Sequence, residues 1–314
     1  MSGTRSACLR ALAKVNLDLR VVGKRADNYH ELRTVFQTIS LADRLDISFT
    51  PGPATTVEME GAAEIPVEEN LVVKAARLVL ESSGCTGRVA FRLDKKIPMG
   101  GGLGGGSSDA AAVLLALPVL AGVRIEPTRL IELGAALGSD VPFFLLGGTA
   151  VALGRGTELY PLPDGPPRPG VLLTSGLHVS TPEAYRALSA RLTSEPQQNK
   201  IVNFQSQVWG GSWDTPRNDF ETVVLEQYPQ LARAKCRLAE LGARPALMTG
   251  SGSALFGLFR TRADATRALE ALRGERVFPI TLVSRTRYRS LWRRQLRAHI
   301  ENNPIWPLLS RYAR

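Results

Sequence analysis

Apolar and polar residues alternate most regularly near the start of the chain. Over residues 11–22, apolar side chains occupy every second position and polar ones take the other face. This period of two is typical of a half-buried strand. Shorter stretches of the same kind predict extended segments over residues 31–39, 45–49, 89–93 and 171–173.

Apolar residues spaced three and four apart predict helices further along the chain. In the first of these, residues 71–80, Asn70 is the expected N-cap. Residues rich in proline, glycine and glutamate predict a surface excursion over 51–69, and a polar stretch predicts a loop over 194–213. The other helices are predicted over residues 110–117, 128–137 and 231–241, the first of them ended by Pro118 and Gly122. Two more helices are predicted to begin at Ser180 and after Asn218.

The irregular order of strands and helices, with extended segments early, predicts an α+β fold. At 314 residues the chain is long enough for two domains. Five prolines between residues 161 and 169 indicate a boundary. We therefore expect two domains, each with a mixed or antiparallel sheet backed by helices and with the active site between them. Their expected ranges are 1–165 and 166–284, followed by a basic extension, 285–314.

Composition narrows the class of protein. Hydrophobic residues make up 44% of the chain and charged residues 22%, as in ordinary globular proteins. No apolar run reaches the roughly 20 residues of a membrane span, and the N-terminus lacks a signal-peptide core. Three scattered cysteines favour a reducing cytoplasm, and neither they nor the three dispersed histidines suggest a metal centre.

The net charge of +10 is concentrated at the C-terminus. Residues 285–314 hold eight arginines and one acidic residue, Glu301, which accounts for +7. Such a segment can bind nucleic acid or an anionic surface. We instead predict a solvated helix appended to the domain. Because every motif precedes it, its removal is expected to leave activity intact.

Residues 98–112, Pro-Met-Gly-Gly-Gly-Leu-Gly-Gly-Gly-Ser-Ser-Asp-Ala-Ala-Ala, contain six glycines between a predicted strand and a predicted helix. Ser107, Ser108 and Asp109 are candidates for the helix N-cap. Glycines let a backbone approach a ligand, and helix N-termini favour anions, so we expect a bound phosphate. No lysine precedes Ser107, which excludes a P-loop. The pattern Gly100-x-Gly102-x-x-Gly105 is a weak dinucleotide signal without the usual acidic partner.

The string Pro-x-Gly-x-Gly-Leu-Gly-x-Gly-Ser-Ser resembles the ATP-binding loop of the GHMP kinases, the family of galactokinase, homoserine kinase and mevalonate kinase. The resemblance covers roughly residues 8–284. It implies that the chain binds ATP together with Mg²⁺. The nucleotide-binding residues implied are Asn70, Lys74, Pro98, Met99, Gly100, Gly101, Gly102, Leu103, Gly104, Gly105, Gly106, Ser107 and Ser108.

Three further motifs are similar to those of this family, and the first of them is similar to one branch of it. They are Ala13-Lys14-x-Asn16-Leu17, continued by Gly23-x-Arg25-x-Asp27-x-Tyr29-His30; Gly138-x-Asp140-Val-Pro-Phe-Phe; and the glycine turn in residues 246–259. Asn28 replaces the usual glycine before Tyr29, a mild departure because asparagine tolerates left-handed turns. In isolation, Lys14 reads as a strand-edge lysine and Asp140 as a helix cap. The resemblance instead implies that Asp140 is the catalytic base and Lys14 its partner.

The implied branch uses ATP to phosphorylate the 2-hydroxyl of a cytidine diphosphate-linked methylerythritol in isoprenoid biosynthesis. No nucleic-acid or membrane partner is expected, and the oligomeric state is open. The alternatives are a GHMP kinase of the homoserine or mevalonate type, or a non-catalytic nucleotide- or RNA-binding protein. We expect Tyr29 and Tyr185 to sandwich the cytosine and His30 to read its edge. The full set of implied substrate-binding residues is Asn16, Tyr29, His30, Thr181, Tyr185, Thr249, Gly250 and Ser251.

Overall fold

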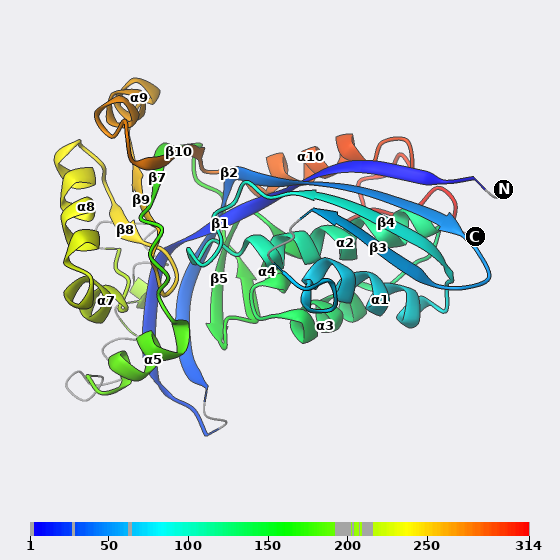
Figure 1. Cartoon of the computed structure of the whole chain (residues 1–314), viewed down its shortest axis with the longest axis horizontal. Coiled ribbons are helices and arrows are strands. Elements are labelled where there is room, and N and C mark those ends of the chain that lie inside the picture. Colours follow the sequence, from blue (N-terminus) through cyan, green and yellow to red (C-terminus); the bar gives the residue numbers. More distant parts are fainter. Residues whose placement is uncertain are drawn as a thin grey trace.

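The computed structural model describes residues 3–26, 29–61, 65–191, 202, 204–206, 208 and 216–313. Asp27 and Asn28 of the first motif lie outside the described residues, as does most of the loop predicted over residues 194–213. The chain forms two sheets, each backed by helices, as the sequence predicted (Figure 1).

A long antiparallel pair of strands is the spine of the molecule. Strand β1 (Arg5–Lys24) pairs with β2 (His30–Pro51) over nearly its whole length. The segments predicted over residues 31–39 and 45–49 are therefore one strand. The sequence predicted two segments because the register of the pair shifts between Leu12 and Lys14. At such a bulge, the alternation of apolar and polar residues is interrupted.

The other strands of this sheet flank β2. Strands β4 (Gly87–Asp94) and β5 (Thr149–Gly154) pair with its two halves, β3 (Thr56–Gly61) runs parallel to β4, and β6 (Glu158–Pro161) pairs with β5. The predicted surface excursion over 51–69 thus contains a strand. It also ends in a short 3₁₀ helix, Val67–Glu69.

Four helices lie on one side of this sheet: α1 (Leu71–Ser83), α2 (Gly105–Ala121), α3 (Pro127–Leu137) and α4 (Val141–Leu146) (Figure 1). The prediction for Asn70 is confirmed, because its side chain accepts the N–H of Val72. The helix start predicted at Ser107–Asp109 is wrong. Gly104, at φ 69°, is the N-cap of α2, so Ser107 and Ser108 lie in its first turn and Asp109 follows them. Pro118 lies inside α2, and Gly122 alone caps its C-terminus.

The second sheet has the order β10-β7-β9-β8 and is antiparallel throughout. Its strands are β7 (Pro169–Thr174), β8 (Ala246–Met248), β9 (Leu255–Leu258) and β10 (Arg276–Thr281). Its helices are α5 (Thr181–Ser189), α7 (Glu221–Gln227), α8 (Pro229–Glu240) and α9 (Arg262–Ala271).

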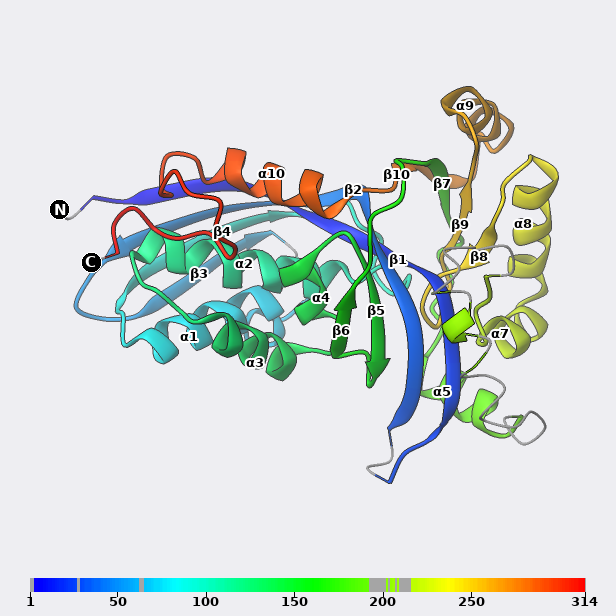
Figure 2. The same ribbon diagram turned by 180° about the vertical axis from the view of Figure 1, so that it is seen from behind.

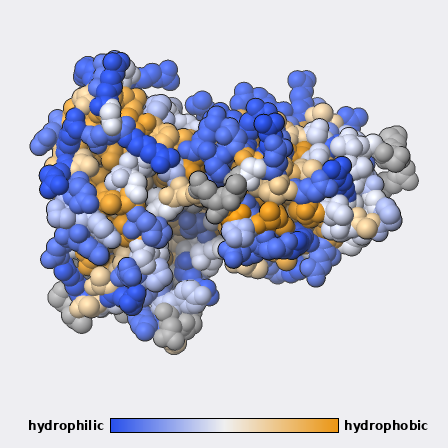
Figure 3. Space-filling view, viewed as in Figure 1, coloured by the Kyte–Doolittle hydropathy of each residue, from blue (hydrophilic) through white to orange (hydrophobic). Residues whose placement is uncertain are grey.

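The two sheets share a hydrophobic cluster. Val15 and Ile39 of the long strands are buried in it together with Leu172, Phe256 and Ile280 of the second sheet. The long strands therefore extend through both parts of the molecule (Figure 1). The domain boundary at residue 165 stays a prediction. In the space-filling view, the surface is hollowed between the side that carries α7 and α8 and the side that carries α1 and α3 (Figure 3). Among the described residues, no helix is long and apolar enough to cross a membrane.

The basic C-terminal segment is part of the core. Helix α10 (Arg285–Gln295) buries Tyr288 and Trp292, each 1% exposed, in the same cluster as α2 and α4. Figure 2 shows α10 in orange along the long strands, with the terminal residues in red beside it. The predicted solvated helix is wrong, because one apolar stripe, Tyr288-Leu291-Trp292, lies among the arginines.

Trp292→Ala is expected to lower the free energy of unfolding by about 3–5 kcal/mol, because it leaves a large cavity in a packed core. Urea unfolding followed by circular dichroism measures the change. Arg294→Ala, on the exposed face of the same helix, serves as the control and is expected to stay within about 0.5 kcal/mol of wild type. Truncation at residue 285 is expected to prevent stable folding. A truncated chain with wild-type stability and activity would contradict this burial.

Candidate active site

The glycine loop lies between β4 and α2 and packs directly against the turn between β8 and β9. Gly102 has φ +71°, and a Cβ there would lie 2.4 Å from the carbonyl oxygen of Thr249. Gly250 has φ +59° and would clash with Gly102 in return. Two glycines are therefore required for these segments, far apart in sequence, to touch.

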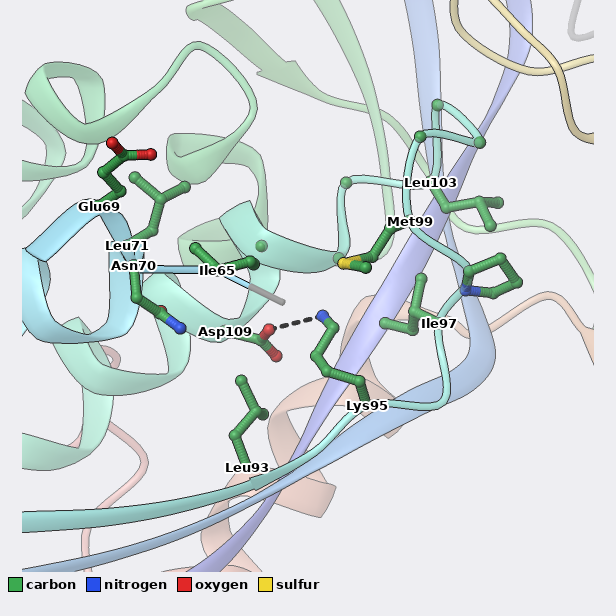
Figure 4. Close-up of a pocket in the computed structure, with 17 residues that line it drawn as sticks. Ile65, Glu69, Asn70, Leu71, Leu93, Lys95, Ile97, Met99, Leu103 and Asp109 are labelled. Atoms are coloured by element: carbon green, nitrogen blue, oxygen red, sulfur yellow. Dashed lines mark hydrogen bonds and ion pairs between the residues drawn. The ribbon is translucent and has the colours of Figure 1, made fainter. Parts of the chain in front are cut away.

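A cavity of about 240 Å³ opens between the loop, α1 and the end of β4 (Figure 4). Asn70 and every predicted loop residue from Pro98 to Gly106 line it. Lys74, Ser107 and Ser108 do not. The sequence analysis missed the remaining lining residues, which are Ile65, Glu69, Leu71, Leu93, Lys95, Ile97 and Asp109.

The N-terminus of α2 adjoins this cavity. Gly104 offers no side-chain cap, so the first backbone N–H groups of α2 are left for an anion. The Ser108 hydroxyl is committed elsewhere, because it is buried and donates to the carbonyl of Leu12 at 2.7 Å. The Ser107 hydroxyl makes no hydrogen bond within the described part of the chain.

A charged cluster forms the floor of the cavity. Lys95 Nζ donates to Asp109 Oδ2 at 2.8 Å and also to Asp43 (Figure 4). Asp43 Oδ1 accepts the backbone N–H of Ile97 at 2.8 Å, which fixes the entry to the loop. Burial raises the pKa of the Asp109 carboxyl to about 7.

Two polar atoms of this cavity have no partner within the described ranges. Asp109 Oδ1 is buried and unpaired. Asn70 uses its Oδ1 as the α1 cap, which leaves its Nδ2 to donate elsewhere. Of the two, Asn70 Nδ2 can donate to a ligand in the cavity, whereas Asp109 Oδ1 has no exposed surface. Two features of the sequence could have indicated this polar cluster: the pair Lys95-Lys96 before the loop, and an aspartate next to the apolar residues of a helix.

Lys14 and Asp140 meet beside the loop. Their Nζ and Oδ2 atoms lie 3.4 Å apart, with the Lys14 side chain 4% exposed and that of Asp140 30% exposed. The Lys14 backbone N–H also donates to the Leu103 carbonyl at 3.0 Å. Although Asp140 occupies the N-cap position of α4, its carboxylate makes no capping hydrogen bond. It is therefore a partly accessible acid beside a buried cation.

Asn16 connects this pair to the third motif. Its Oδ1 accepts Lys14 Nζ at 2.9 Å, the Gly250 N–H at 2.9 Å and the Thr249 hydroxyl at 3.1 Å. Its Nδ2 donates to the Thr34 hydroxyl at 2.8 Å. These internal contacts occupy Oδ1 and one of the two N–H groups of Nδ2, and the binding of substrate by Asn16 stays a prediction.

Two predicted substrate-binding hydroxyls lie together at the edge of the site. Thr181 Oγ1 and Ser251 Oγ are 2.7 Å apart, one at the start of α5 and the other in the turn after β8. They come from different parts of the second domain. A hydroxyl pair of this kind can rotate to donate to a ligand or accept from it.

The aromatic residues are arranged differently from the predicted sandwich. The Tyr185 ring stacks on His30 at a centroid distance of 4.6 Å, and Phe220 packs edge-on against it at 4.8 Å. Tyr29 is 52% exposed and has the Arg155 guanidinium 3.4 Å above its ring. His30 therefore occupies the Tyr185 face that was expected to contact the base. Burial lowers the pKa of His30.

The fold and this assembly of loop, lysine and carboxylate define a class, the GHMP kinases. Residues 70–148 match the family described as "GHMP kinases N terminal domain" and residues 210–276 match "GHMP kinases C terminal". A homoserine kinase from Cytophaga hutchinsonii aligns with a TM-score of 0.65 at 18% identity, over 88% of this chain and 97% of the other. At that identity, the likeness shows the fold alone.

Higher similarity selects one branch. The chain is 59% identical to the 4-diphosphocytidyl-2-C-methyl-D-erythritol kinase of Solibacter usitatus over 99% of both chains, and 40% identical to that of Syntrophotalea carbinolica over 83% of this chain and 92% of the relative. A crystal structure of 4-(cytidine 5'-diphospho)-2C-methyl-D-erythritol kinase aligns with a TM-score of 0.74 at 42% identity, over 88% of this chain and 98% of the other. The chain belongs to the 4-diphosphocytidyl-2-C-methyl-D-erythritol kinase family.

Proposed function

We propose that this chain transfers the γ-phosphoryl group of ATP to the 2-hydroxyl of 4-(cytidine 5'-diphospho)-2-C-methyl-D-erythritol, giving the 2-phosphate and ADP. The observation that carries the proposal is the Lys14–Asp140 pair, held beside the glycine loop in a chain that is 59% identical to such a kinase. The reaction serves isoprenoid biosynthesis. A cytoplasmic location, predicted from the scattered cysteines, is part of the proposal.

The cavity lined by the loop is the proposed ATP site. Its glycines let the backbone approach the phosphates, and the open N-terminus of α2 favours their charge. On the wall, Asn70 Nδ2 can donate to a ring nitrogen of adenine.

Magnesium is proposed to arrive with the nucleotide. Within the described residues there is no group of three or more His, Cys, Asp or Glu that could hold a metal ion. Mg²⁺ usually keeps several waters and binds chiefly through substrate phosphates. Ser107, in the first turn of α2, would offer its hydroxyl oxygen as a protein ligand. When bound, the ion neutralises charge on the phosphates.

Asp140 is the proposed base for the substrate hydroxyl. Its carboxylate is partly exposed, so a hydroxyl can reach it, and no capping bond competes for its oxygens. Lys14 holds the carboxylate in place and can stabilise negative charge that develops during transfer. Because Lys14 also binds the Leu103 carbonyl through its backbone, the base and the phosphate loop share one support.

The cytidine end of the substrate is proposed to bind at the stacked pair His30 and Tyr185 and at Tyr29, which precedes His30 in the chain. Tyr29 supplies an exposed aromatic face, and Arg155 beside it supplies a positive charge suited to the diphosphate. His30, stacked on Tyr185 and hydrogen-bonded to Ser189 at 2.6 Å, can read the edge of the base. Tyr185 then acts through His30 as its support.

The purified protein is expected to consume ATP in the presence of Mg²⁺ only when the cytidine-linked polyol is present. A coupled assay of ADP release measures this, with homoserine and mevalonate as comparison substrates. Turnover of either of those, without turnover of the cytidine compound, would move the chain to another branch.

Asp140→Asn is expected to lower kcat by about 10²–10⁴-fold, the usual contribution of a general base, while nucleotide affinity stays unchanged. Single-turnover kinetics and equilibrium titration of an ATP analogue measure the two effects. Asp94→Asn, an exposed carboxylate on β4, is the matched control. A wild-type single-turnover rate in Asp140→Asn would reduce Asp140 to a structural residue.

Tyr29→Ala is expected to weaken binding of the cytidine substrate by about 5- to 150-fold, since base stacking is worth about 1–3 kcal/mol. Tyr185→Ala is expected to weaken this binding through His30, which loses the ring that supports it. ATP affinity is expected to stay constant, and phenylalanine at either position to be nearly silent. Calorimetric titration measures both ligands. Tyr160→Ala, an equally exposed tyrosine on β6, is the control. Unchanged substrate affinity in Tyr29→Ala would refute the stacking role.

A further inference from the structure

Helix α4, which Asp140 begins, is held at its other end by the C-terminal segment, residues 285–313. The last carbonyls of any helix lack partners within the helix. Here the Tyr288 hydroxyl donates to the Phe144 carbonyl at 2.5 Å and Trp306 Nε1 to the Leu145 carbonyl at 2.9 Å. The C-terminal segment thus caps two carbonyls of α4, in addition to the Phe143 carbonyl, which the Gly147 N–H caps.

Arginine side chains extend this cap into the next strand. Arg285 Nε donates to the Gly147 carbonyl at 3.2 Å, and its Nη2 donates to the Thr149 carbonyl at 2.5 Å. The turn after α4 is shaped to receive the segment, because a Cβ on Gly147 would lie 2.2 Å from the Tyr288 ring. Gly147 also has φ +68°, which favours glycine.

The position of α4 matters for both halves of the site. The helix has six residues and is therefore about 9 Å long, so a shift at one end moves the other. At its N-terminus, Asp140 faces Lys14. In its middle, the Phe144 ring packs on the loop, since a Cβ on Gly104 would lie 2.8 Å from that ring. Phe144 is also the residue whose carbonyl Tyr288 binds.

Several arginines of the segment are bound within the protein, whereas Arg287, Arg294 and Arg297 are exposed. Arg289 lies 5.1 Å from the centre of the Trp306 ring, and Arg293 donates to the carbonyls of Asn303 and Ile305. Burial, followed by the charges of Arg285 and Arg293, lowers the pKa of Arg289. These cations fold the terminal residues back onto α10 and so place the Trp306 indole against α4.

We propose that the C-terminal segment is a positioning element for the active site, with Tyr288 and Trp306 as its positioning residues. By capping α4 they set the distance from Asp140 to the loop and to Lys14. The inference rests on the proposed function, in which Asp140 is the base. Neither residue touches a substrate, so the effect appears in turnover and not in binding.

The test compares two substitutions that each remove one buried hydroxyl-to-carbonyl hydrogen bond. Tyr288→Phe removes the bond to α4 and keeps the ring in the core. Ser310→Ala removes the 2.6 Å bond from the same segment to the Val119 carbonyl near the end of α2, away from α4. The pair separates positioning from a general loss of stability.

Tyr288→Phe is expected to lower kcat about 10- to 100-fold, because a displacement of about 1 Å at a reacting group can cost that much. KM for both substrates is expected to stay within twofold of wild type. Trp306→Phe acts in the same direction, and the double variant is expected to fall further. Ser310→Ala is expected to keep the wild-type kcat. Equal losses of kcat in Tyr288→Phe and Ser310→Ala would overturn the proposal.

Amide hydrogen exchange supplies a readout that does not depend on activity. The Gly147 N–H, bonded to the Phe143 carbonyl at 2.8 Å, reports the last turn of α4. It is expected to exchange faster in Tyr288→Phe and to be unchanged in Ser310→Ala. Unchanged exchange in Tyr288→Phe would overturn the capping role. If the wild-type protein shows no activity on the cytidine compound, the proposed function is refuted. Faster exchange of the Gly147 N–H in Tyr288→Phe, with unchanged exchange in Ser310→Ala, would still support the anchoring of α4.

Discussion

The buried amide of Asn16 is the interaction on which the site depends. It is 2% exposed, and its single oxygen accepts from Lys14, Thr249 and Gly250 while its nitrogen donates to Thr34. Buried polar groups are costly unless they are satisfied, and this one is satisfied only when β1, β2 and the turn after β8 are all in place. Aspartate would accept but could not donate to Thr34 unless protonated. Asparagine therefore couples the folding of both sheets to the orientation of the Lys14 ammonium.

The close contact of two glycine turns completes this arrangement. Gly102 and Gly250 touch backbone to backbone, so the loop that lines the cavity and the turn that carries Thr249 cannot move independently. Side chains would force the two segments apart and weaken the hydrogen bonds of Asn16 to the turn. The loop proposed to bind the nucleotide and the turn that carries Thr249 thus touch at two residues that have no side chain. This steric reason accounts for glycines that a phosphate-binding role alone does not require.

Local patterns predicted what local forces determine. The alternation in β1, the cap at Asn70 and the glycine loop depend on neighbouring residues, and the sequence indicated each. The motif resemblance indicated Lys14 and Asp140, and the structure brings them together, although spacing alone could not show that they meet. Asp109 was taken for a cap because its partner Lys95 is 14 residues away and on another element. A bulge interrupts the alternating pattern, so the sequence predicted two segments where β2 is one strand. Serines normally cap helices, so the sequence predicted too late a start for α2, whose first turn contains them.

The C-terminal segment shows why net charge is a weak guide to a partner. Residues 285–314 carry +7 and were weighed as a nucleic-acid surface or a solvated helix. Arginine has a long apolar stem and five N–H donors, so it can cover a hydrophobic stripe and cap carbonyls at the same time. Arg285 and Arg293 do this, each binding two or more backbone carbonyls of the protein itself. These hydrogen bonds order the segment. The ordered segment then presents the Tyr288 hydroxyl and the Trp306 indole to α4. The arginines of this segment therefore help to hold α4, and with it Asp140, in position.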